Sequence, residues 1–207
     1  MQSQAPKLVL ASASAVRRRL LEAAGLQVET LPAAVDEAEV KLALKAENAS
    51  AIQVAETLAE LKARRVSERL GTAGSSGPFV IGADQMLECE GRWFDKPADL
   101  DAARAQLLAL AGRHHTLETS VCVVRDGGRI WHHNARARLT LRPLSEAFID
   151  RYLAAVGEAA LTSVGAYQLE GPGIQLFQKV DGDFFTILGL PLLPLLTLLR
   201  SNGLIPQ

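Results

Sequence analysis

The sequence has few cysteines, almost no net charge and no hydrophobic run of membrane-spanning length. Its two cysteines, Cys89 and Cys122, show neither metal-site spacing nor a disulfide framework. We therefore expect free thiols in a reducing, cytoplasmic compartment. The apolar stretch at 187–199 is too short to cross a bilayer, and two prolines interrupt it. We also expect no signal peptide, because the short apolar run at 8–11 precedes the nearby arginines.

The charge balance narrows the class of partner. A net charge of −1 gives no overall basic field that would attract a nucleic-acid polymer or an anionic membrane. Arginines cluster only locally, at 17–19 and at 136 and 138. Such local clusters fit a small anionic ligand better than a polymer.

Length and periodicity predict one α/β domain spanning 1–207, without internal repeats or low-complexity tracts. A hydrophobic share of 48% is ordinary for a globular chain with a sizeable core. Apolar runs predict strands at 7–11, 27–31, 79–81, 115–124 and 130–141, and a last hairpin at 176–180 and 184–188. Helical periodicity follows Ser14, spans 48–70, 99–111 and 145–156, and resumes after Gly189. Loops are expected at 35–37, 71–78 and 163–173.

The most informative stretch runs from 79 to 97. An apolar strand is followed by Gly82, Ala83 and then Asp84, a position for a carboxylate that packing does not explain. The small neighbours would leave room for a ligand to approach the backbone. A turn at 90–92 predicts a hairpin that brings Lys96 back toward Asp84. The alternative is a strand end with a solvated aspartate and a surface lysine.

Two other segments carry polar side chains in suggestive places. Ser12, Ser14 and Arg17 lie where a first strand turns into a helix, whose N-terminus offers N–H groups to a phosphate. In the alternative interpretation Ser14 is only an N-cap. In the glycine-rich segment 163–173, a base could stack on Tyr167 and bond to Glu170, although composition alone favours an ordinary loop. The adjacent histidines at 114–115 and 132–133 point to opposite faces of strands, so they predict no shared metal site.

Four ordered motifs together resemble the Maf family of nucleoside triphosphate pyrophosphatases over nearly the whole chain. They are A-S-x-S-x-x-R-x-x-L-L at 11–21, V-D-E at 35–37, I-G-A-D-Q with D-K-P at 81–85 and 95–97, and G-A-Y…E-G-x-G…G-L-P-L at 165–192. The resemblance implies a mixed β-sheet flanked by helices in an elongated fold with two lobes around a central cleft. That fold is similar to the one of inosine triphosphate pyrophosphatases.

The resemblance also implies residue roles and a cofactor. Catalytic positions match Asp84, Glu37, Lys62 and Lys96, and substrate-binding positions match Ser12, Ser14, Arg17, Gln85, Tyr167 and Glu170. Glu37 and Asp84 would hold a divalent cation, Mg²⁺, Mn²⁺ or Co²⁺, since carboxylates suit such ions. The reaction would release pyrophosphate and a nucleoside monophosphate. A homodimer is the candidate assembly. Replacing Lys62 or Lys96 is expected to slow catalysis with little effect on stability.

The substrate depends on two departures from the commonest family pattern. This chain has Val16 where many members have arginine, and Glu170 where many have glutamine. Both differences resemble the 7-methyl-GTP branch, although that branch usually has an aromatic residue at the position of Val16. A dTTP or UTP pyrophosphatase is the alternative within the family. A non-catalytic regulator of septum formation is the alternative from another class.

Overall fold

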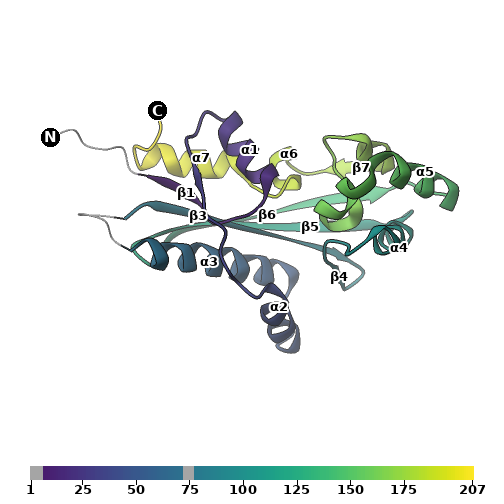
Figure 1. Cartoon of the computed structure of the whole chain (residues 1–207), viewed down its shortest axis with the longest axis horizontal. Helices are drawn as coiled ribbons and strands as arrows, with labels where there is room; N and C mark the ends of the chain where they lie inside the picture. Colours follow the sequence, from purple (N-terminus) through teal and green to yellow (C-terminus); the bar gives the residue numbers. More distant parts are fainter. Residues whose placement is uncertain (1–6, 72–76) are drawn as a thin grey trace. The chain divides into compact units, whose positions relative to one another are not determined.

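The computed structural model of this protein describes residues 7–71 and 77–207 (Figure 1). In these residues seven strands form one open sheet in the order β2-β1-β3-β5-β6-β7, with β4 paired to β3 outside this path. The strands are β1 (Leu8–Leu10), β2 (Glu29–Thr30), β3 (Phe79–Cys89), β4 (Arg92–Phe94), β5 (His114–Arg125), β6 (Gly128–Leu141) and β7 (Phe177–Asp181). β1 runs parallel to β2 and β3, while β4 and β7 pair antiparallel with their neighbours. The predicted α/β class with a mixed sheet is confirmed.

Seven helices complete the described chain. They are α1 (Ala15–Ala23), α2 (Glu37–Ala46), α3 (Ala51–Leu70), α4 (Leu100–Leu110), α5 (Glu146–Val156), α6 (Phe184–Ile187) and α7 (Leu192–Ser201). Three short 3₁₀ turns lie at Gly157–Thr162, Val164–Ala166 and Pro172–Leu176. Among the described residues, no helix is both long and apolar enough to span a membrane.

The chain divides into two compact units. The first consists of Met1–Gln85, Thr119–Ala135 and Gly189–Gln207, and the second of Met86–Glu118 and Arg136–Leu188. The prediction of one domain with two lobes around a cleft stays a prediction.

In the first unit, helices cover both faces of the parallel strands. Figure 1 shows α3 on one face and α1 with α7 on the other. The backbone N–H of Ser50 donates to Oε1 of Gln53 at 2.8 Å, which caps α3 at its start. The buried side of α3 packs on β1, β3 and β5 through Val9, Ala11, Ala59, Ala63, Val66, Val80, Cys122 and Val124. The predicted helix at 48–70 is confirmed with a start three residues later.

In the second unit, the predicted hairpin forms. Leu87 of β3 lies opposite Phe94 of β4, and Glu90 and Gly91 make the turn with φ angles of 52° and 76°. Helix α4 packs against α5 and against the first two 3₁₀ turns that follow it, at Gly157–Thr162 and Val164–Ala166. Helix α4 thus supports the start of the segment 163–173.

Three sequence-based expectations are wrong in detail. Residues 184–187 form α6 rather than a strand, because the side chain of Asp183 accepts the backbone N–H of Thr186 and caps a helical turn. Glu37 lies on a helix rather than in a loop, because Asp36 caps α2 by accepting the N–H of Glu39 at 3.0 Å. The strand expected at 27–31 shrinks to β2. Residues 72–76 of the expected loop at 71–78 lie outside the described residues.

Candidate active site

The centre of the candidate site is an ammonium group held between two carboxylates, all within the first unit. Nζ of Lys62 lies 2.5 Å from Oδ1 of Asp84 and 2.7 Å from Oε1 of Glu37. Lys62 and Asp84 are 8% and 5% exposed, whereas the side chain of Glu37 is 44% exposed. The structure therefore brings together three of the four predicted catalytic residues.

Because Gly82 has no side chain, helix α3, which carries Lys62, lies close to strand β3, which carries Asp84. A Cβ on Gly82 would lie only 2.0 Å from the backbone oxygen of Ala59 and 2.9 Å from Cβ of Ala63, both on α3. Only glycine allows this approach, and Lys62 follows Ala59 by one helical turn. The space beside Gly82 is thus filled by α3. The expectation that it admits a ligand is wrong.

Burial and charge act against each other on the two carboxylates. Burial raises the pKa of Asp84 above its ordinary value, by more than the cations Lys62 and Arg17 lower it. At Glu37 burial also acts to raise the pKa, but the charge and hydrogen bond of Lys62 together with the charges of Lys41 and Arg17 outweigh it, and the pKa is lowered. The pair therefore combines a more basic buried carboxylate with a more acidic one that reaches solvent.

The predicted anion-binding turn forms between β1 and α1. Oγ of Ser14 accepts the backbone N–H of Arg17 at 3.3 Å, and Oγ of Ser12 accepts the N–H of Ser14 at 3.1 Å. Ser14 is thus the N-cap of α1, as in the alternative interpretation. An N-cap satisfies only one of the N–H groups in a first helical turn, so this role leaves donors that could bind a phosphate.

Arg17 connects three segments of the first unit. Its Nε donates to the carbonyl of Gly189 at 2.7 Å, and its Nη1 donates to the carbonyl of Ala83 at 2.8 Å. Burial lowers the pKa of Arg17, while the charges of Asp84 and Glu37 raise it. The carbonyl of Gly189 is a contact that sequence reasoning missed, because no side-chain pattern marks a backbone acceptor.

Gln85 is placed by a neighbour that the sequence did not single out. Its Nε2 donates to Oγ1 of Thr119 on β5 at 2.8 Å. Thr119 is fully buried, and it lies on the strand next to β3 in the sheet. Gln85 stays partly exposed beside Asp84. A buried threonine in an apolar strand is a weak signal in sequence, which is why it was missed.

The remaining predicted residues, Lys96, Tyr167 and Glu170, belong to the second unit. Lys96 and Glu170 are exposed, whereas Tyr167 is 4% exposed. The ring of Tyr167 packs edge-on against Phe177 at 4.8 Å between centroids, and its hydroxyl is 2.7 Å from Nε2 of His115. A base could stack on Tyr167 only if the ring left this cluster.

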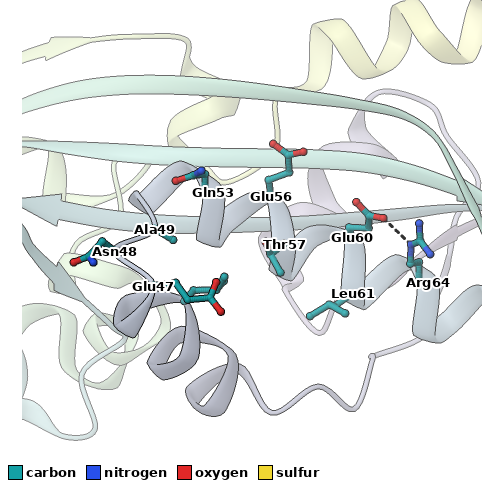
Figure 2. A pocket seen from close by; sticks show the side chains of 10 residues that line it. Glu47, Asn48, Ala49, Gln53, Glu56, Thr57, Glu60, Leu61 and Arg64 are labelled. Atoms are coloured by element: carbon teal, nitrogen blue, oxygen red, sulfur yellow. Dashed lines mark hydrogen bonds and ion pairs between the residues drawn. The ribbon is translucent and has the colours of Figure 1, made fainter.

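A pocket of about 750 Å³ lies elsewhere in the first unit, and none of the predicted site residues lines it. Figure 2 shows its side chains along α3 and at the turn between α2 and α3, with Glu60 paired to Arg64. Its lining residues are Leu44, Glu47, Asn48, Ala49, Gln53, Glu56, Thr57, Glu60, Leu61 and Arg64. Glu56 and Glu60 both pair with Arg129, so this acidic wall is already neutralised in part.

The carboxylates of Glu37 and Asp84 fit a divalent cation that takes its remaining ligands from a bound phosphate compound and water. Oxygens of Glu37 and Asp84 converge on one point, now taken by Nζ of Lys62. Among the described residues there is no group of three or more metal-binding side chains. Mg²⁺ commonly binds through one or two carboxylates and takes its other oxygens from phosphates and water.

A helix N-terminus that follows a strand, as at Ser14, is a common place for phosphate binding in α/β proteins. The chain belongs to the Maf family, since the model of that family, described as Maf-like protein, matches residues 7–202. A nucleoside triphosphate pyrophosphatase of Paramagnetospirillum magneticum is 58% identical over 195 residues, which cover 94% of this chain and 98% of the relative. A 7-methyl-GTP pyrophosphatase of Rhizobium meliloti is 50% identical over 200 residues, which cover 97% and 98%.

Proposed function

We propose that this chain is a nucleoside triphosphate pyrophosphatase, which hydrolyses a nucleotide between its α and β phosphates. The observation that carries the proposal is the cluster of Lys62, Asp84 and Glu37 beside the turn at Ser14. Perturbed carboxylates cluster at functional sites, and the buried Asp84, whose pKa is raised, is such a group. The names of the full-length relatives, nucleoside triphosphate pyrophosphatase and 7-methyl-GTP pyrophosphatase, support the same activity.

Each residue has a role that follows from its charge and place. Asp84 accepts the proton of the attacking water. The N-terminus of α1, with Ser12, Ser14 and Arg17, binds phosphate oxygens, and Gln85 adds an amide beside Asp84. Lys62 and Lys96 neutralise the charge that develops on the leaving pyrophosphate.

Glu37 and Asp84 would hold the cation, which we propose to be Mg²⁺, Mn²⁺ or Co²⁺. Such an ion supplies charge neutralisation and a more acidic bound water. Because Lys62 bonds to both carboxylates, its ammonium would have to release at least one of them to a bound cation. Lys62 would then be able to bond to a phosphate oxygen.

For the substrate we propose a purine nucleotide, 7-methyl-GTP first, with Glu170 as the residue that reads the base. Glu170 is exposed at the turn of residues 168–171, where the N–H of Gly171 donates to the carbonyl of Gln168 at 3.2 Å. A carboxylate suits a base that is cationic and presents donors. The alternative within the family is dTTP or UTP.

The biological setting is a proposal of the same kind. An enzyme of the nucleotide pool would act in the cytoplasm. Its partner would be a small nucleotide and not a nucleic-acid polymer. Such an enzyme could work as a homodimer. The two cysteines of the chain, Cys89 and Cys122, are buried and unpaired with each other, which suits a reducing compartment. A regulator of septum formation without catalysis is the rival, and no specific contact in the site favours it.

The test is a screen of nucleoside triphosphates, including 7-methyl-GTP, for pyrophosphate release with Mg²⁺, Mn²⁺ and Co²⁺. The wild type should release pyrophosphate, and Asp84→Asn should lower kcat by about a thousandfold or more while keeping the fold. Asp101→Asn, an exposed change on α4, is the matched control and should act like the wild type. Absence of turnover on every nucleotide and metal, or near-native turnover by a folded Asp84→Asn variant, would overturn the proposal.

A further inference from the structure

One half-buried side chain in the second unit bonds to two loops that each carry a predicted site residue. Gln106 lies on α4, and its Nε2 donates to the backbone carbonyl of Asp95 at 2.8 Å. The Oε1 of the same amide accepts the backbone N–H of Gly165 at 3.2 Å. Asp95 directly precedes Lys96, and Gly165 begins the segment that leads to Glu170. The two ends of one amide therefore connect the loop of Lys96 to the loop of Glu170.

The backbone around Gly165 is fixed by further contacts that make the bond from Gln106 effective. Gly165 has a φ of 77°, and a Cβ there would lie 2.6 Å from the ring of Tyr167 and 2.8 Å from Leu87. The hydroxyl of Tyr152 donates to the carbonyl of Ala166 at 3.2 Å, and Oγ of Ser163 donates to the carbonyl of Tyr167 at 2.5 Å. These contacts hold the backbone from Gly165 to Tyr167 next to the bond from Gln106.

The loop of Lys96 lies between β4 and α4. Residues 95–99 have no regular structure, and both Asp95 and Lys96 are exposed. Contacts from a regular element restrict the conformations of such a loop. The bond from Gln106 on α4 is one such contact, directly beside Lys96.

We propose that Gln106 is a positioning residue that sets the distance between the phosphate-binding Lys96 and the base-reading Glu170. The inference rests on the proposed function, since it takes the roles of these two residues from there. A nucleotide has a fixed covalent distance between base and triphosphate, so both loops must be held at a matching distance. An error of 1 Å in such positioning can cost on the order of a hundredfold in rate.

The amide can be dissected, because its two bonds use different atoms. Gln106→Met keeps the length of the side chain and removes both bonds. Gln106→Glu keeps an oxygen that accepts the N–H of Gly165, but an ionised carboxylate cannot donate to the carbonyl of Asp95. Arg104→Met is the matched control, because Arg104 lies on the same helix and pairs with Glu146 and Asp150 of α5 instead of either loop.

Two readouts separate positioning from a general loss of stability. The first readout compares kcat/KM for the preferred nucleoside triphosphate with inhibition by inorganic tripolyphosphate. Tripolyphosphate has no base, so its binding does not need the two loops at a matching distance. Gln106→Met should lower kcat/KM for the nucleotide by about ten- to a hundredfold, and leave inhibition by tripolyphosphate within about twofold of the wild type. Hydrogen exchange without substrate is the second readout. Gln106→Met should speed exchange in both 94–98 and 163–173, Gln106→Glu chiefly in 94–98, and Arg104→Met in neither.

Equal losses for nucleotide and tripolyphosphate in Gln106→Met would overturn the inference, as would kinetics matching those of Arg104→Met. Failure of the proposed function has a different signature: the wild type itself releases no pyrophosphate from any nucleotide. Hydrogen exchange does not depend on turnover, so it tests the role of Gln106 even if the wild type is inactive. Unchanged exchange in both loops of Gln106→Met would show that the amide does not hold them.

Discussion

The ammonium of Lys62 lies 2.5 Å from a carboxylate oxygen of Asp84, and both side chains are buried. A buried ion pair contributes little compared with an apolar pair of the same volume, but breaking it by removing one partner is costly. Glu37 pairs with the same ammonium, so one side chain forms the ion pairs of both acidic groups of the site. The predictions for Lys62 and Glu37 follow from this arrangement.

Lys62→Met should both reduce activity and destabilise the fold. The change leaves Asp84 buried without its ammonium, which we expect to cost about 3–5 kcal/mol in the free energy of unfolding. Urea unfolding measures this cost, and Lys179→Met, whose side chain is 71% exposed, is the control. The double variant Lys62→Met with Asp84→Asn should lose less stability than the two single changes together. Strict additivity would show that the pair is not coupled.

Glu37→Gln should change the metal requirement more than the fold. Glu37 is partly exposed, so the amide can be solvated and stability should change little. The loss of a carboxylate ligand should raise the half-saturating Mn²⁺ concentration at least as much as loss of an outer-shell partner does, which is about tenfold. Manganese binding can be followed without turnover by electron paramagnetic resonance, and chelation by EDTA should stop the wild-type reaction. An unchanged Mn²⁺ affinity in Glu37→Gln would remove Glu37 from the metal site.

His115 should make the protein sensitive to acid. The ring is 2% exposed, and burial lowers its pKa to about 4. In the unfolded chain the pKa is near the ordinary 6.5, so the folded state prefers the neutral ring. This contribution is fully present above pH 6.5 and is lost as the pH falls toward 4, by up to about 3 kcal/mol. Tyr167 and Phe177 face the ring and stay uncharged throughout this range.

The test compares the wild type with His115→Gln, which can still bond to Tyr167 but cannot be protonated. Urea unfolding at pH 4.5, 5.5 and 7 should show a smaller loss of stability with acid in the variant than in the wild type. His114→Gln is the control, because His114 is the exposed neighbour on the opposite face of β5. Equal acid sensitivity in wild type and His115→Gln would contradict the prediction.

Sequence predicted most elements well where local patterns are strong. The period of α3 and the Asp126-Gly127 turn between β5 and β6, with φ angles of 51° and 74°, are such cases. Sequence failed at Phe184, where β-forming residues gave way to a helical turn capped by Asp183. The local cap by Asp183 decided the structure there, and β propensity did not.

The candidate site shows the same division. Family motifs mark Lys62 and Asp84, but nothing local reveals that both are buried in one ion pair. The sequence therefore predicted a small effect of Lys62 on stability, whereas its burial predicts a large one. Gln106 is invisible in the sequence, because its role consists of two bonds to backbone atoms at Asp95 and Gly165. Contacts of this kind need the three-dimensional structure.

The last prediction concerns Glu170 and the base. An ionised carboxylate accepts hydrogen bonds and cannot donate them. Methylated guanine presents adjacent N1–H and N2–H₂ donors that a carboxylate can accept as a bidentate pair. Uracil and thymine present two carbonyl oxygens around a single N–H, and these would repel the carboxylate. A polar group left unpaired by the wrong base costs about 1–3 kcal/mol, which is roughly a five- to two-hundredfold preference.

Glu170→Gln should therefore shift the preference toward pyrimidine nucleotides, because an amide both donates and accepts. The measurement is kcat/KM for 7-methyl-GTP, dTTP and UTP on both proteins. Glu158→Gln, an exposed change outside the segment 163–173, should leave the ratios unaltered. Inhibition by inorganic tripolyphosphate should be the same in all three proteins, because it engages only the phosphate end of the site. A wild type that prefers dTTP or UTP, or a ratio that does not move in Glu170→Gln, would show that Glu170 does not read the base.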